Sequence, residues 1–188
     1  MEEFQLSNNS SNEAGWLTPV SDSPAYDTDL DRLLSRWMRA VSGLPDSSVR
    51  PRWQPDQPPL MPVDVNWCAF GIVEWPSYNT PASTRQTDEN AELWRHESFV
   101  AMASFYGPAG MQYAAVFRDG ITIEQNNAEL NRLGLSLGSY SDITPFPELI
   151  NNQWVRRYDL HVQLRRKVVR TYNIKSIVDG NVTISTGD

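Results

Sequence analysis

Residues 93–110, LWRHESFVAMASFYGPAG, decide the fold class. The first residues of this stretch alternate polar and apolar side chains, and both alternating faces become apolar between Phe99 and Phe105. Such a change is typical of a β-strand that runs from the rim of a sheet into a part covered on both sides. Gly107 and Pro108 then end the strand, because neither residue supports a regular ladder. The stretch therefore predicts a buried sheet strand followed by a break.

Residues 27–41 carry the strongest helical pattern of the chain. Their apolar side chains recur every three or four positions, as one stripe of a helix requires. The members of this stripe are Leu30, Leu33, Leu34, Trp37, Met38 and Val41. Aspartates open the segment and arginines close it, which matches the helix macrodipole. Gly43 followed by Pro45 predicts the end of this helix.

The remaining segments complete an α+β fold. They are an extended proline-rich segment over 44–62, a buried strand over 67–75, a polar loop over 75–91, a helix over 109–133 with a kink at Gly120 and an end at Gly134 and Gly138, a connector over 142–150, an amphipathic strand over 154–164, and a hairpin of 168–178 with 182–185 around Asp179 and Gly180. We expect a mainly antiparallel sheet with two helical elements packed on it. This single domain over 25–188 follows a flexible acidic arm over 1–24.

The composition excludes several classes of protein. No stretch approaches the roughly 18 apolar residues that cross a bilayer, so no membrane segment is expected. Cys68 is the single cysteine, which excludes an intrachain disulfide framework. The net charge of −7 disfavours a protein whose main task is to grip the nucleic-acid backbone, since that task needs a basic surface.

Charge is distributed unevenly along the chain. Residues 1–31 contain seven acidic side chains and no basic one, whereas residues 154–175 contain seven basic side chains and one acidic one, Asp159. The two segments are either complementary docking patches or ordinary solvated faces. Arg and Trp dominate the hot spots of protein interfaces, so the group Arg50, Arg52 and Trp53 is a further candidate contact. Packing of Trp53 under the proline-rich segment is the alternative.

Signatures of catalysis and of cofactor binding are missing from the sequence. It has no phosphate-binding glycine loop, no zinc-protease motif, no C-x-x-C and no nucleophile elbow. His96 and His161 are the two histidines, and a metal site would need a third ligand beside them. Cys68 lies in an apolar strand, where it is expected to fill the core. We predict no catalytic residue, no cofactor and no metal.

Four stretches of the sequence resemble a known family. They are VRPRWQPDQPP at 49–59, VNWCAFGIVEW at 65–75, ESFVAMASFYGPAGMQYAAVFRDGITIEQNNAEL at 97–130 and WVRRYDLHVQLRRKVVRTYNI at 154–174. They are similar to the tail terminator, or neck terminator, proteins of tailed bacteriophages over residues 49–177.

The resemblance implies a structural virion protein with a tail-terminator-like fold and no catalytic residues. Its subunits would form a homo-oligomer, a hexameric ring that caps the tail tube and, in contractile phages, the sheath. The ring would join the tail to the head-side connector, and genomic DNA would pass through the channel without specific binding. The implied location is the neck of the virion, which assembles in the cytoplasm of the host bacterium.

In such a ring, we expect the loop over 75–92 and the strands over 154–175 to reach neighbouring subunits or the terminal tube ring. The expected interface residues are Arg156, Arg157, Arg165 and Arg166, which would form ion pairs between subunits or with the tube, and a second strip of Arg50, Arg52 and Trp53. A ring needs two different complementary patches on each subunit.

Two hypotheses from other classes stay open at this point. In the first, the chain is a non-enzymatic binding module, and the arginine-rich strand over 154–175 recognises an acidic ligand; that hypothesis predicts a rise in melting temperature with the ligand. In the second, Asp159 and His161 form an acid/base pair of an enzyme. It predicts loss of activity when either residue is replaced by alanine.

Overall fold

The computed structural model describes residues 16–56, 58–76, 80–150 and 152–174. These residues divide into two compact units. The smaller unit holds the described residues of 1–24, 78–95 and 168–188, and the larger unit holds those of 25–77 and 96–167. All seven predicted interface residues lie in the larger unit. The domain boundary predicted at residues 24 and 25 stays a prediction.

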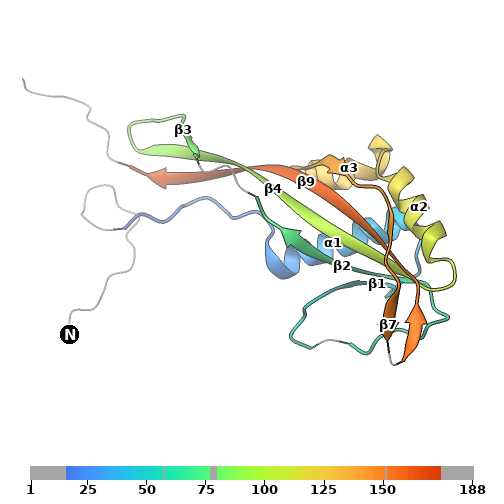
Figure 1. The fold of residues 1–188 in the computed structure, drawn as a ribbon. Coiled ribbons are helices and arrows are strands. Elements are labelled where there is room, and N and C mark those ends of the chain that lie inside the picture. Colours follow the sequence, from blue (N-terminus) through green and yellow to red (C-terminus); the bar gives the residue numbers. More distant parts are fainter. Residues whose placement is uncertain (1–15, 57, 77–79, 151, 175–188) are drawn as a thin grey trace, which may run out of the picture. The chain divides into compact units, whose positions relative to one another are not determined.

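Strands of the described residues form a mostly antiparallel sheet, and with three helices they confirm the predicted α+β class (Figure 1). The sheet has the order β1-β2-β4-β9-β5, with β3 paired to β4 and β6 paired to β9. The bounds are β1 Val49–Pro51, β2 Trp67–Glu74, β3 Ala82–Thr84, β4 Asn90–Tyr106, β5 Leu135–Tyr140, β6 Thr144–Pro145 and β9 Arg157–Asn173. β1 runs parallel to β2, whereas β2 is antiparallel to β4 and β5 is antiparallel to β9. β7 (Glu148–Ile150) and β8 (Gln153–Val155) form a separate antiparallel pair.

The helices α1 (Asp27–Ser42), α2 (Gly110–Gly120) and α3 (Glu124–Arg132) share one core with the sheet. The largest fully buried side chains of this core are Leu30, Leu34, Trp37, Met38, Phe70, Phe99, Phe105, Phe117, Ile121, Leu130, Leu160 and Leu164. Every second residue of β4 and of β9 points into the core, as the pleat of a strand requires. The opposite side of the sheet, which carries Ala69, Tyr106 and Asp159, is called the outer face.

The predicted helix over 27–41 and the predicted strand over 93–106 are confirmed. The helix ends one residue later than expected, at Ser42, and Gly43 follows in the left-handed region with a φ of 73°. The N–H of Gly43 donates to the carbonyl of Arg39, which closes the last turn. A strong apolar stripe and a glycine stop were therefore sufficient to place this element.

The single helix expected over 109–133 is wrong, because the segment forms two helices. α2 ends at Gly120 and α3 begins at Glu124, so Gly120 marks a break rather than a kink. The side-chain amides of Asn126 and Asn127 donate to the carbonyls of Gly120 and Ile121, which the end of α2 leaves without helical partners. Gly134 follows α3 as expected, whereas Gly138 lies inside β5.

Two segments expected to be irregular contain short strands. β3 lies inside the predicted loop over 75–91, and β4 begins at Asn90. β6 and β7 lie inside the predicted connector over 142–150. β3, β6 and β7 have only two or three residues each, too few to show a period of two. The strand predicted over 154–164 is interrupted at Arg156, and β9 continues beyond it to Asn173. The hairpin turn predicted at Asp179 and Gly180 lies outside the described residues.

In the smaller unit, residues before α1 bond to the distal part of β9. The N–H of Val20 donates to the carbonyl of Thr171, and the N–H of Thr171 donates to Oγ of Ser21. Val20 and Ser21 belong to the predicted arm over 1–24, and these two bonds join that described part of the arm to β9.

Candidate interface

The predicted interface residues fall on three parts of the larger unit. Arg50, Arg52 and Trp53 lie on β1 and directly after it. Arg156 and Arg157 lie where β8 meets β9, and Arg165 and Arg166 lie near the middle of β9. Their surroundings differ, so each group is described separately.

Arg52 and Arg157 take part in one polar network on the outer face. Arg52 donates through NH2 to the hydroxyl of Tyr106 over 3.1 Å, and that hydroxyl donates to Glu148 over 3.3 Å. Arg157 donates to the same Glu148 oxygen over 3.3 Å and to Asp159 over 2.7 Å. The network therefore links the residue that follows β1 to β4, β7 and β9 through side chains.

Burial shapes the ionisation of this network. Desolvation raises the pKa of the Tyr106 hydroxyl above its ordinary value, although the nearby Arg52 and Arg157 guanidinium groups oppose the rise. Burial alone would lower the pKa of Arg157, but the hydrogen bond and negative charge of Asp159, with the charges of Tyr106 and Glu148, raise it instead. Arg157 is thus held as a cation by partners from its own chain.

Trp53 covers part of the outer face beside this network. A Cβ atom added to Gly71 of β2 would lie 2.5 Å from the Trp53 ring, so the glycine gives the ring room to approach the strand. The ring nevertheless stays 68% exposed. A hollow of about 500 Å³ adjoins it, lined in part by Arg50, Arg52 and Tyr106.

Arg166 is buried and paired. Its Nε donates to Glu97 over 2.9 Å and its NH1 donates to the carbonyl of Ala25 over 2.6 Å. The side chains of Arg166 and Glu97 are 3% and 8% exposed. The guanidinium lies over the ring of Tyr26, 4.2 Å from its centre, and the Tyr26 hydroxyl donates to Glu97. This cluster fastens the residues before α1 to β4 and β9.

Among the predicted interface residues, Arg156 and Arg165 are the exposed cations of the β8–β9 segment. Neither has a carboxylate partner within the part of the chain that the structure describes. Arg50 is half-buried and donates to the carbonyls of Ser47 and Pro59. The interface roles expected for all seven residues stay predictions, and the structure adds intramolecular partners for Arg157 and Arg166.

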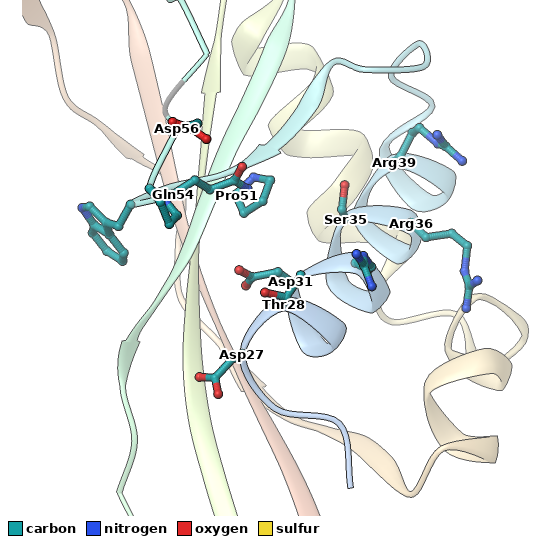
Figure 2. A pocket seen from close by; sticks show the side chains of 12 residues that line it. Asp27, Thr28, Asp31, Ser35, Arg36, Arg39, Pro51, Gln54 and Asp56 are labelled. Atoms are coloured by element: carbon teal, nitrogen blue, oxygen red, sulfur yellow. The ribbon is translucent and has the colours of Figure 1, made fainter.

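A groove of about 810 Å³ lies between α1 and the chain that follows β1 (Figure 2). Asp27 and Asp31 face it from α1, and Asp56 faces it from the other wall. Figure 2 shows Arg36 and Arg39 pointing away from Asp31. Desolvation, then the charge of Asp27, raises the pKa of the Asp31 carboxyl above its ordinary value. This groove was not predicted, because it joins two segments about 20 residues apart in the sequence.

The alternating pattern contains a signal for Glu97 and Arg166. Glu97 shares its face of β4 with Phe99 and Ala101, and Arg166 shares its face of β9 with Leu164. Two opposite charges at core positions of neighbouring strands indicate a buried pair. The count of basic residues over 154–175 did not take account of which face of the strand each residue lies on.

The described residues contain no group of three His, Cys, Asp or Glu side chains that could hold a metal ion. Cys68 is fully buried, and burial raises the pKa of its thiol. Asp159 accepts a hydrogen bond from Arg157, and the N–H of His161 donates to Ser141. None of the helices among the described residues is long and apolar enough to cross a membrane.

Comparison with known protein families identifies a match. A family model described as phage neck terminator protein matches residues 28–188. No curated protein matches the chain. The matched range includes α1 from its second residue onward, all the other helices and strands described above and all seven predicted interface residues.

Proposed function

The chain belongs to the phage neck terminator protein family, and from this premise we propose that its subunits form a ring that closes the tail of the virion. Membership makes the chain a structural phage neck protein and a virion component. The ring, which we take to be a hexamer, caps the tail tube and joins it to the head-side connector, and DNA passes through its hole. Assembly takes place in the cytoplasm of the host bacterium.

The family match over residues 28–188 is the observation that carries this proposal. Exposed apolar side chains support a role in assembly. Phe146, Leu149 and Trp154 are 53%, 54% and 72% exposed, and Leu149 is the register partner of Trp154 in the β7–β8 pair. Exposed tryptophan with neighbouring apolar side chains is typical of protein–protein contacts.

The intramolecular partners of Arg157 and Arg166 decide which of the predicted interface residues we assign to subunit contacts. Arg157 and Arg166 already have carboxylate partners in their own chain, so their first role is to hold the fold. We therefore assign subunit or tube contacts to the exposed Trp53, Arg156 and Arg165 before the others. The same pairing reduces the free positive charge that an acidic-ligand module would need on strand 154–175.

The proposal is tested by complementation of a phage that lacks this protein. Heads and tails of such a phage should accumulate separately, and wild-type protein added to the lysate should restore joined virions. Trp154→Ala should restore few virions, because it removes the most exposed of the large apolar side chains among the residues that the structure describes. Val73→Ala, a truncation at another exposed apolar position, serves as the control. Joined virions at the wild-type level without the protein would contradict the proposal.

A further inference from the structure

The groove of Figure 2 has negative charge without an internal partner. Arg32, Arg36 and Arg39 of α1 also line the groove, but each pairs with an acid that does not line it: Arg32 with Asp29, Arg36 with Glu129 and Arg39 with Asp46. By contrast, Asp27, Asp31 and Asp56 have no basic partner in the part of the chain that the structure describes.

Two further observations indicate that the groove binds a cationic group of another molecule and is not an ordinary solvated face. The α1 dipole accounts for an aspartate in the first turn, such as Asp27. It does not account for Asp56, which is on another segment, or for Asp31, whose carboxyl pKa is raised by burial and by the charge of Asp27. Trp53 lines the same groove with a largely exposed ring. An exposed indole beside carboxylates suits an arginine, which can stack on the ring while it pairs with the acid.

The complementary charge lies at the other end of the sheet. Arg165 is exposed on β9, and its register partner is Ser136 of β5, the last strand in the order β1-β2-β4-β9-β5. The groove adjoins β1, the first strand in that order. Both lie in the larger unit, so one chain presents the acidic groove and the cation at opposite ends of its sheet.

We propose that the groove formed by α1 and residues 51–56 receives Arg165 of a second copy of this chain, with Trp53 stacking on the guanidinium and Asp31 pairing with it. A contact between two different patches is heterologous, and its repetition closes a ring when the rotation from one copy to the next is a whole fraction of a turn. The inference rests on the ring proposed above and identifies the contact that builds it. Docking removes the pair from water, which strengthens the attraction between the two charges and makes a like charge at either position costly.

Charge reversal tests this contact with the full-length chain. Asp31→Arg alone and Arg165→Asp alone should each raise the protein concentration at which rings form by at least about tenfold, because each places like charges opposite one another. The double variant, and an equimolar mixture of the two single variants, should form rings again, since both restore opposite charges at every contact. The mixed ring would alternate the two variants.

Asp64→Arg is the matched control. It makes the same charge change, but Asp64 is exposed, does not line the groove and is not the partner of an arginine that lines it. It should form rings as the wild type does, and circular dichroism should show that all variants are folded.

The outcomes separate the two proposals. Rings of Asp31→Arg or Arg165→Asp at the wild-type concentration would overturn the contact and leave the ring intact. Rings that are lost in the single variants but not restored in the double variant and the mixture would also overturn it, because the side chains at positions 31 and 165 would then not face each other. A wild type that forms no ring in any condition would overturn the ring itself.

Discussion

Glu97→Gln removes the negative charge that faces Arg166 while it keeps the size of the side chain. Arg166 donates to Glu97 over 2.9 Å, and both side chains are almost completely buried. The hydroxyl of Tyr26 donates to the two carboxylate oxygens over 2.9 and 3.2 Å. The change therefore leaves a buried guanidinium without its countercharge at the place where the chain enters α1.

The cost follows from that geometry. Removing one partner of a buried ion pair costs roughly 3–5 kcal/mol, because the remaining charge is left uncompensated. Arg166 keeps the carbonyl of Ala25 and the ring of Tyr26, so we expect the lower value, about 3 kcal/mol. For a chain of this size, each kcal/mol lowers Tm by roughly 2–4 °C, which gives a decrease of about 6–12 °C.

Urea denaturation followed by tryptophan fluorescence measures the free energy of unfolding. Glu74→Gln is the control, since Glu74 is exposed, and it should stay within about 0.5 kcal/mol of wild type. Glu97→Gln combined with Arg166→Met should cost less than the sum of the two single changes by at least about 1 kcal/mol. A loss below about 1 kcal/mol in Glu97→Gln, or strict additivity in the pair, would refute the reasoning.

Two further predictions concern the core. Trp37→Ala should lower the free energy of unfolding by roughly 3–5 kcal/mol, because the buried indole packs against Phe117 and donates to the carbonyl of Asn126; a smaller loss in urea denaturation would contradict that packing. Burial raises the pKa of the Cys68 thiol, so the unfolded chain loses this proton first and stability should fall as the pH rises above the ordinary thiol pKa of 9.0. Cys68→Ala should lack that part of the fall in denaturation curves between pH 8 and 10, and equal slopes for the two proteins would contradict the assignment.

Sequence reasoning succeeded where a single period governed a long segment. The stripe from Leu30 to Val41 predicted α1, and the apolar faces around Phe99 predicted β4. These elements owe their form to burial of one or two faces, which a periodic pattern records directly.

It failed where bonds between distant groups decide the structure. The break between α2 and α3 depends on side chains of Asn126 and Asn127 that bond carbonyls six residues earlier. The pairing of Arg157 with Glu148 depends on how the β7–β8 pair lies beside β9. The prediction from sequence gave the arginines of the basic strand the same interface role. In the structure, the alternation of the strand places Arg165 in solvent and Arg166 in the core.

The mass of the purified full-length protein, measured by light scattering with negative-stain images of the same peak, tests the central claim most directly. The ring account predicts particles of about six times the 21.4 kDa subunit mass, each with a hole at its centre, or, where the free protein stays a single subunit, rings bound to the ends of added purified tail tubes. A single-subunit mass at every concentration, with no ring bound to the added tubes, would contradict it.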